Sequence, residues 1–460
     1  MCGIAGMYNL DGENVAEKLR LSLFALNHRG QEFAGICVGG PRQVKSHKAK
    51  GLVFQALTNK KIARLDGFNA IAHTRYSTTG DSNLSGAQPM KAITRKNGRD
   101  KEIYIVHNGN IPNISPIKKK LISQGAEFQS DSDTEVILKY LSFNYTGHIT
   151  ETLAKMMTEI KGSYSLLVML EDNLYAIRDP MGNRPLLMGQ IGERTHIFAS
   201  ETYAFDIVGG KVVRDVRPGE IVKISKAGVE SIQVIENPTP AHCIFEWAYL
   251  QDSTSTFEGI PVGMARVNAG RLLAKYVPKD RIDIVIGVPE TGIYAAQGLA
   301  EAIDKPLVNG ISKNRFSMRT FIEPNESIRK YMLRMKLKIV GEFIEGKKIC
   351  VVDDSIVRSL TARILVQMLK EYSPKEVHLA IATPPIMYPC DLGVSIKTKD
   401  ELFVWDTNGN VKSNDQMIEE LGVDSLVYLS IEDLCESVGK PINNFCLRCF
   451  NDRHPLKNLS

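Results

Sequence analysis

The 460-residue chain lacks several features that would assign it to whole classes of protein. No apolar run approaches the ~18 residues that a membrane-spanning helix needs. The N-terminus has no basic stretch followed by an apolar core, the pattern of a signal peptide. Internal repeats and low-complexity tracts are also absent. With 43% hydrophobic and 24% charged residues, the composition is typical of a soluble globular protein. We therefore expect a cytoplasmic protein with no membrane partner.

A strong charge of one sign is missing as well. The net charge of +5 is too small to indicate nucleic-acid binding, so we expect no nucleic-acid partner. The charge is unevenly distributed, because residues 313–348 carry ten Lys or Arg against four Glu, a local excess of +6. This segment is suited to an anionic ligand, although a solvated basic helix face has the same composition.

Cysteine is scarce and unevenly spaced, which argues against a disulfide framework. The eight cysteines are Cys2, Cys37, Cys243, Cys350, Cys390, Cys435, Cys446 and Cys449. The last two form a C-x-x-C pair, whose thiolates could share one metal centre. A redox pair or chance spacing would give the same pattern. Cys37, Cys350 and Cys435 lie in apolar contexts and are expected to be core residues.

The chain length predicts two or three domains. Short β-rich runs fill the first half, with helical patterns near 13–27, 116–124 and 133–141. After the polar, Pro-rich segment ENPTPA at 236–241, apolar strands alternate with helices, which predicts a parallel sheet covered on both faces. We therefore expect domains at 1–235 and 236–460. Ligands of such sheets bind at the C-terminal strand ends, where VPETG and VVDDSIVRS lie.

Cys2 is a candidate nucleophile. Initiator methionine is normally removed before a small side chain, so the mature chain would carry a thiol and an α-amine on one residue. An α-amine has a pKa of about 7.7–8.0 and can accept the thiol proton near neutral pH. The alternative interpretation is a small apolar residue at the start of a strand.

Four further motifs follow in order, LNHRGQEFAGI at 26–36, HTRYSTTG at 73–80, HNGN at 107–110 and DSDTE at 131–135. Together with MCGIAG they resemble the glutamine amidotransferases of the N-terminal-nucleophile (Ntn) class, as do DPMGNRPL and ASE further along. The resemblance implies an Ntn-hydrolase αββα sandwich in which the thiol attacks the glutamine amide and forms a thioester. The implied site residues are Cys2 as nucleophile, Asn108 and Gly109 as the oxyanion hole, Arg75 and Asp133 as contacts to the α-carboxylate and α-ammonium, and His28 as a further substrate contact.

The segment KKICVVDDSIVRSLT at 347–361 reads as an apolar strand, two acids, a loop and a helix. Paired carboxylates suit Mg²⁺ or sugar hydroxyls, and the helix N-terminus suits a phosphate. A surface turn with a capping Asp is the alternative. The segment resembles the signature of type I phosphoribosyltransferases, α/β domains that bind phosphoribosyl pyrophosphate (PRPP), and 288–292 and 313–322 resemble their pyrophosphate loop and lid. The implied ligands are Thr291, Asp353 and Asp354 for Mg²⁺, and Lys313, Arg315, Arg319, Ser355, Arg358 and Thr361 for PRPP.

Joined in this order, the two halves resemble the amidophosphoribosyltransferase family over nearly the whole chain. The resemblance implies a glycosyltransferase that hydrolyses glutamine and channels the ammonia to PRPP, releasing 5-phosphoribosylamine, pyrophosphate and glutamate in the first step of purine synthesis. It also implies a homodimer or homotetramer and, as in the family's iron–sulfur branch, a 4Fe–4S cluster. The implied cluster ligands are Cys243, Cys390, Cys446 and Cys449, for which a structural Zn²⁺ is the chemical alternative.

Departures from the family pattern gather in the PRPP half. Ser359 and Leu360 stand where the family usually has Gly-Thr, and Met318 replaces a lid glycine. The pyrophosphate loop reads P-E-T-G instead of P-D-S-G, and QDSTS follows FEWAYL where A-R-P-D-S is common. Two alternatives therefore stay open: a paralogue that delivers ammonia to another phosphorylated acceptor, and a PRPP-binding regulator without chemistry.

Overall fold

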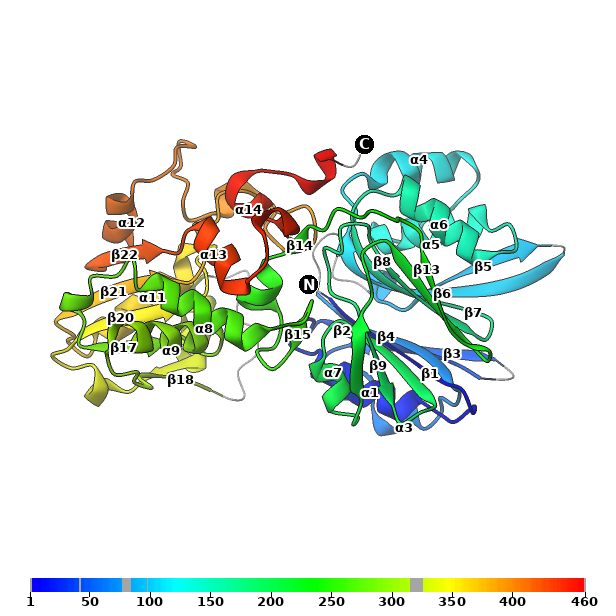
Figure 1. The fold of residues 1–460 in the computed structure, drawn as a ribbon, viewed down its shortest axis with the longest axis horizontal. Coiled ribbons are helices and arrows are strands. Elements are labelled where there is room, and N and C mark those ends of the chain that lie inside the picture. The colour runs from blue at the N-terminus through cyan, green and yellow to red at the C-terminus, as the bar shows by residue number, and fades with distance from the viewer. Residues whose placement is uncertain (1, 41–42, 77–83, 97, 315–325, 459–460) are drawn as a thin grey trace.

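The computed structural model describes residues 2–40, 43–76, 84–96, 98–314 and 326–458. Figure 1 shows two bodies side by side, one built from the first half of the chain (blue to green) and one from the second half (light green to red). The N-terminal end of the chain lies between them. Within the described ranges, no helix is both long enough and apolar enough to cross a membrane.

Two antiparallel sheets form the first half. Their strand orders are β11-β9-β10-β1-β4-β2-β3 and β13-β12-β8-β7-β6-β5. The first sheet contains β1 (Gly3–Asn9), β2 (Phe33–Gly39), β3 (Val44–Lys50), β4 (Asn69–Arg75), β9 (Leu187–Ile191), β10 (Thr195–Ala199) and β11 (Lys211–Asp215). The second contains β5 (Met90–Lys96), β6 (Arg99–Asn110), β7 (Ser163–Leu170), β8 (Asn173–Arg178), β12 (Glu220–Ser225) and β13 (Gly228–Gln233).

The two sheets are packed face to face, with helices on their outer sides. Along β1, Ile4 and Tyr8 join the apolar cluster shared with the second sheet. The alternate residues Ala5 and Met7 pack with α1 (Ala16–Ala25). Ile105 of β6 packs with the helices on the other outer side. Because both faces of the central strands are buried, strands such as β1, β2 and β7 read as nearly continuous apolar runs. The predicted αββα sandwich is therefore confirmed.

The helices of the first half are mostly where the sequence predicts them. The predicted patterns correspond to α1, α4 (Ile114–Ser123) and α5 (Asp133–Asn144). The sequence analysis did not predict α6 (Ile149–Glu159), although its buried Leu153, Met156 and Met157 have helical spacing. The short helices are α2 (Val53–Ala56), α3 (Asn59–Ile62) and α7 (Tyr203–Asp206).

A four-stranded parallel sheet, in the order β17-β20-β21-β22, forms the centre of the second half. Its strands are β17 (Ile284–Gly287), β20 (Lys348–Asp353), β21 (Glu376–Ile381) and β22 (Ser425–Tyr428). The helices are α8 (Val262–Leu273), α9 (Thr291–Ile303), α10 (Glu326–Lys336), α11 (Ser359–Lys370), α12 (Asn414–Leu421) and α13 (Ile431–Val438), and a ribbon pairs β18 (Ile311–Lys313) with β19 (Leu337–Ile339). One apolar cluster joins sheet and helices, which confirms the predicted parallel-sheet α/β fold.

The two halves of the chain meet in a region formed by residues 242–261 and 445–451. Residues 234–241 form neither helix nor strand, and β14 (His242–Cys243) then pairs in parallel with β23 (Phe445–Cys446). The π-helical turn η2 (Glu246–Leu250), the hairpin β15 (Thr256–Phe257)–β16 (Ile260–Pro261) and the short α14 (Arg448–Asn451) lie in the same region. Met181 of the first half packs with Ala241, Leu392 and Cys446. In Figure 1, β14 and α14 lie beside the first half.

Candidate active site

The thiol of Cys2 lies at the end of the central strands of the first sheet. In the antiparallel pairing of β1 with β4, Gly3 faces Thr74. The Cys2 Sγ is 3.6 Å from the carbonyl oxygen of Tyr76, to which it donates. Arg75 is buried directly before that carbonyl, and a Cβ at Gly86 would lie 1.9 Å from the Arg75 Nη1. The guanidinium therefore occupies the space that a side chain at position 86 would take.

The predicted oxyanion hole is at the end of β6. Asn108 is fully buried, and neither atom of its side-chain amide has a hydrogen-bond partner among the described residues. A buried amide without a partner is costly, which is expected of a group that awaits a ligand. Gly109 follows, and a Cβ there would lie 2.0 Å from the Ser163 carbonyl oxygen. Only glycine fits, so the backbone can approach a substrate closely.

Asp133, the first residue of α5, lies against the same end of β6. One carboxylate oxygen accepts from the Ile111 N–H at 3.1 Å and the other from the Thr134 N–H at 2.8 Å. Burial raises the pKa of Asp133, but the nearby His107 ring and these hydrogen bonds outweigh it and hold the pKa below its usual value. The carboxylate is therefore charged and suited to bind an ammonium group. Gln88 donates to Thr134 at 2.9 Å and accepts from the His107 N–H at 2.6 Å.

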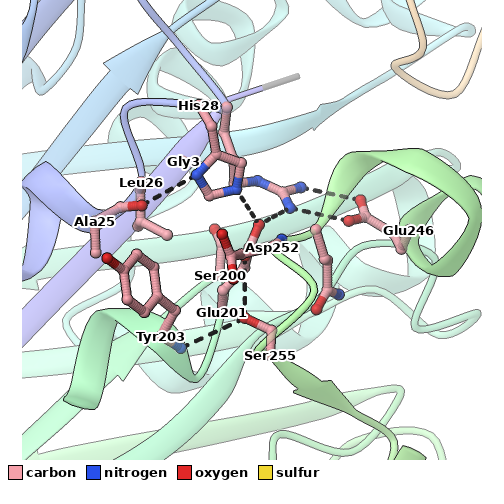
Figure 2. Close-up of polar contacts among 12 residues, drawn as sticks. Gly3, Ala25, Leu26, His28, Ser200, Glu201, Tyr203, Glu246, Asp252 and Ser255 are labelled. Atoms are coloured by element: carbon pink, nitrogen blue, oxygen red, sulfur yellow. Dashed lines mark hydrogen bonds and ion pairs between the residues drawn. The ribbon is translucent and has the colours of Figure 1, made fainter. Parts of the chain in front are cut away.

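Three buried charged side chains, Arg29, Glu201 and Glu246, form a network that the partly exposed His28 joins. Figure 2 shows His28, Glu201 and Glu246. Arg29 donates through Nε to the Cys2 carbonyl oxygen at 3.0 Å and through Nη1 to Glu201 at 2.6 Å. Its two Nη atoms also donate to the two carboxylate oxygens of Glu246, both at 3.0 Å. His28 has both ring nitrogens near acceptors, Glu201 at 2.9 Å and the Ala25 carbonyl at 3.1 Å. Its imidazole is thus engaged within the chain.

Glu201 links the first half to the loop after η2. Its second oxygen accepts from the Asp252 N–H at 2.8 Å and from the Ser255 hydroxyl at 3.1 Å, as Figure 2 shows. Burial raises the pKa of Glu201, but the charges of His28 and Arg29 outweigh it and lower the pKa from 4.5 to about 2. The sequence analysis did not select Arg29, Glu201 or Glu246 as site residues. The HRG, ASE and FEW motifs that contain them were the available signal.

The paired acids of the second half lie at the C-terminal edge of the parallel sheet. Asp353 ends β20, and Asp354 accepts from the Ser355 hydroxyl at 2.6 Å and from the hydroxyl of Thr291, the first residue of α9. Burial raises the pKa of both carboxyls, and for Asp353 the neighbouring Asp354 raises it further. Two buried acids whose charged forms are disfavoured are suited to a divalent cation or to sugar hydroxyls.

The predicted phosphate loop leads into α11, whose first helical residue is Ser359. Thr361 is exposed in the first turn, where backbone N–H groups are available to an anion. Arg358 forms an ion pair with Glu401, and Lys313 lies 3.5 Å from Glu290 of the pyrophosphate loop. Arg315 and Arg319 lie outside the described residues.

The four cysteines of the second predicted metal centre lie at the junction of the halves. Cys243 faces Cys446 across the β14–β23 pair, and the Cys449 carbonyl accepts from the N–H groups of Met387 and Tyr388, near Cys390. Burial and neighbouring cysteines together raise the pKa of Cys243 to about 11 and that of Cys446 to about 12, against the opposing charge of Arg184. Among the described residues, no three His, Cys, Asp or Glu side chains are close enough together to hold one metal ion.

This arrangement defines a class: an Ntn-type αββα glutamine amidotransferase domain fused to a phosphoribosyltransferase-like parallel sheet. The family model of the glutamine amidotransferase domain matches residues 73–206. Amidophosphoribosyltransferases of Synechococcus elongatus and Archaeoglobus fulgidus are each 38% identical over 99% of this chain, covering 91% and 98% of their own lengths. The chain therefore belongs to the amidophosphoribosyltransferase family.

Solved structures agree over the whole chain. The glutamine PRPP amidotransferase of Bacillus subtilis, in a complex with ADP and GMP, superposes with a TM-score of 0.89 at 35% identity and covers 99% of this chain and 97% of its own. A second structure, described as the allosteric regulatory enzyme of purine biosynthesis, gives the same TM-score of 0.89 at 36% identity, with coverage of 99% and 96%. The similarity therefore includes both halves and their mutual placement.

The charge of Glu201 should stabilise the folded protein. Because its folded pKa is depressed, this contribution is present above the unfolded value of 4.5 and is lost as the pH falls towards about 2. A shift of this size corresponds to about 3 kcal/mol. We expect Glu201→Gln to lower the free energy of unfolding at pH 7 by about 3 kcal/mol and to flatten its acid dependence, as measured by urea denaturation from pH 7 down to pH 3.

The matched control is Glu230→Gln. Glu230 forms a surface ion pair with Lys223 at 3.2 Å and its side chain is 58% exposed. This variant should stay within about 0.5 kcal/mol of the wild type. Superimposable acid profiles for Glu201→Gln and the wild type would contradict the assignment.

Proposed function

We propose that this protein is an amidophosphoribosyltransferase that makes 5-phosphoribosylamine, pyrophosphate and glutamate from glutamine and PRPP. The observation that carries the proposal is the placement of the Cys2 thiol against the Tyr76 carbonyl, directly after the buried Arg75, in a chain whose parallel-sheet strand β20 ends in Asp353, followed by Asp354. We infer that the domains divide at 235/236, a division supported by the separate apolar clusters on either side. The homodimer or homotetramer that the family resemblance implies stays a prediction.

In the glutamine site, we infer that the Cys2 Sγ attacks the side-chain amide carbon of glutamine. The residue's own amine, free once Met1 is removed, takes the thiol proton. The Asn108 side-chain amide and the Gly109 N–H stabilise the oxyanion. The carbon–nitrogen bond then breaks, ammonia leaves with that proton, and water hydrolyses the thioester to glutamate. The partnerless buried amide of Asn108 supports this assignment.

The remaining glutamine contacts follow from charge. Arg75 is buried and directly precedes Tyr76, whose carbonyl contacts Cys2, and its two-pronged guanidinium matches an α-carboxylate. Asp133 keeps its negative charge and suits the α-ammonium. For His28, the contact with Glu201 supports a role in holding the Arg29–Glu201 pair, which is adjacent to the substrate position.

In the PRPP site, ammonia forms a bond to C1 of the ribose while the bond from C1 to pyrophosphate breaks. The N–H groups of the loop from Ser355 to Thr361 bind the 5-phosphate, and Lys313 faces the pyrophosphate, as Arg315 and Arg319 are also expected to do. Thr291, Asp353 and Asp354 fit Mg²⁺, because both acids lie in a buried site that disfavours their charged forms. Bound Mg²⁺ would neutralise charge on the departing pyrophosphate.

We also infer that Cys243, Cys390, Cys446 and Cys449 bind a 4Fe–4S cluster. The other three thiols lie close enough to Cys449 to raise its pKa further, beyond the effect of burial. Four thiolates are the usual ligand set of a 4Fe–4S cluster, and a structural Zn²⁺ with the same four ligands is the alternative. Bound there, the cluster would cross-link β14, β23 and the segment around Cys390.

Leu360 is the observation that favours a second candidate function, in which ammonia is delivered to another phosphorylated acceptor. Leu360 is half-buried and packs on the apolar core with Val357, so position 360 offers no hydroxyl to a phosphate, whereas Ser359 places one where the family usually has glycine. A paralogue with a different phosphorylated acceptor would hydrolyse glutamine without releasing pyrophosphate from PRPP. A PRPP-binding regulator would do neither.

Replacing the nucleophile separates the two sites. We expect Cys2→Ala to abolish glutamine hydrolysis and glutamine-dependent phosphoribosylamine formation, because the substitution removes the attacking thiol. Ammonia-dependent formation should stay within about twofold of the wild type, since the PRPP residues are untouched. Glutamate, pyrophosphate and phosphoribosylamine are followed with anaerobically purified protein, Mg²⁺ and PRPP. Loss of both activities would contradict the two-site mechanism.

Removing the charge of one of the paired acids should lower the activity and raise the stability of the metal-free protein. Asp353→Asn should lower pyrophosphate release more than about tenfold, because charge stabilisation by a metal accounts for several kcal/mol. The raised pKa means that the charged carboxylate destabilises the folded state, so the Asn variant should be more stable at pH 7 without metal. Thermal unfolding with and without Mg²⁺ checks this. Asp280→Asn, an exposed position, should change neither property.

The cluster can be tested by colour and metal content. Protein purified without oxygen should be brown, with about four irons per chain. Cys390→Ser should lose most of the iron, whereas Cys435→Ala, a core cysteine outside the group, should keep it. Colourless protein containing about one zinc per chain would refute the cluster in favour of Zn²⁺.

A further inference from the structure

The segment from Asp391 to Gly393, in the second half, lies directly against the end of β6 in the first half. The Asn110 side-chain amide donates to the Asp391 carbonyl oxygen at 2.7 Å. A Cβ at Gly393 would lie 3.4 Å from the Gly109 carbonyl carbon and 3.1 Å from the Arg184 Nη2. The segment is therefore in close contact with the backbone of the proposed oxyanion hole.

The same segment also connects to the nucleophile. The Leu392 carbonyl oxygen accepts from Arg184 at 2.6 Å and 3.2 Å. Arg184 donates to Glu246 at 3.2 Å, and Glu246 accepts from Arg29, which holds the Cys2 carbonyl. The side chains of both arginines and of Glu246 are fully buried. Two successive carbonyls, Asp391 and Leu392, thus connect the segment to the end of β6 and, through Arg184 and Glu246, to the arginine that holds Cys2.

The segment is itself held from several directions. The Asp391 carboxylate is 3.0 Å from His454 and 3.2 Å from Arg448. The Cys390 N–H donates to the Ile396 carbonyl at 2.9 Å. Leu392 is 1% exposed and packs in the apolar junction between the halves. The carbonyl oxygens of the segment from Asp391 to Gly393 therefore have fixed positions.

We propose that Asn110 is a positioning residue for glutamine hydrolysis, which fixes the Gly109 N–H by anchoring β6 to the Asp391 carbonyl. The inference rests on the proposed function and extends it to a residue that contacts no reacting atom. Gly109 has no side chain to hold its own peptide. An oxyanion donor stabilises charge only when its position is set before the reaction, so a neighbouring anchor is needed.

The test is Asn110→Asp in the full chain. Asp has the same shape but no N–H donor, and its carboxylate faces a carbonyl oxygen. Outright loss of an oxyanion donor costs about 10²–10³ in kcat, so a displaced donor should cost at least about tenfold. The KM for glutamine should stay within about twofold, because Arg75 and Asp133 make the ground-state contacts. Ammonia-dependent phosphoribosylamine formation and the rate of Cys2 alkylation by iodoacetamide should be unchanged.

Asn14→Asp is the matched control. The Asn14 amide also donates to a backbone carbonyl of the first half, that of Leu65 at 3.2 Å, and is bonded outside this network. This variant should retain the wild-type kcat. Gly393→Ala perturbs the same segment without substituting a residue of β6, since φ at position 393 is +112° and the new Cβ would lie 3.1 Å from the Arg184 Nη2. It should reproduce the selective fall in kcat, including where Asn110→Asp folds poorly.

A purely structural role predicts a different outcome. Wild-type kcat in both variants, or equal loss of glutamine- and ammonia-dependent rates together with a lower Tm, would overturn the inference. A wild-type protein without Cys2-dependent glutamine hydrolysis would overturn the proposed function itself and the inference with it. An active wild type with unaffected variants would overturn the inference alone.

Discussion

The backbone of Cys2 is held by Arg29, and the position of Arg29 depends on two buried carboxylates from different parts of the chain. Glu201 belongs to the first half and Glu246 to η2, after the junction. Burying an arginine and two glutamates is expensive, and the cost is offset only when each donor and acceptor is matched. Docking of the second half supplies Glu246. The geometry of the nucleophile therefore depends on how the two halves are joined.

Carboxylates in the two sites have opposite environments. Glu201 and Asp133 are buried next to cationic side chains, so their pKa values fall. Asp353 and Asp354 are buried next to each other, so theirs rise. In the proposed glutamine site the buried carboxylates therefore keep their charge beside cationic partners. In the proposed PRPP site the charged forms of the two acids are disfavoured, and a bound cation would stabilise them.

Many of these features could be predicted from the sequence because they are local. Strands buried on both faces give continuous apolar runs, and the helices α1, α4 and α5 follow apolar periodicity. Asn108 and Gly109 were selected from a four-residue motif, and the structure then places a buried amide and a tight glycine there. Helix α6 was missed, although its apolar residues have helical spacing.

Other features arise between distant residues. Glu246 lies 217 positions from Arg29, and Asp391 lies 281 positions from Asn110, so no local pattern reveals either pair. The sequence also does not reveal that the pKa of Glu201 is lowered and that of Asp353 is raised. Both are acids near apolar residues in the sequence, and the direction of each shift depends on the charged groups that the fold places beside them.

The sequence by itself determined the residue types and their local spacing: a cysteine next to the initiator, ordered motifs for an α-amino acid substrate, and paired acids after an apolar strand. Tertiary structure decided which carboxylate meets which guanidinium and which carbonyl meets Asn110. The physical reason is the distance along the chain over which each effect acts. Propensity and periodicity act over a few residues, whereas ion pairs and oxyanion geometry depend on ångström distances set only when both halves are packed together.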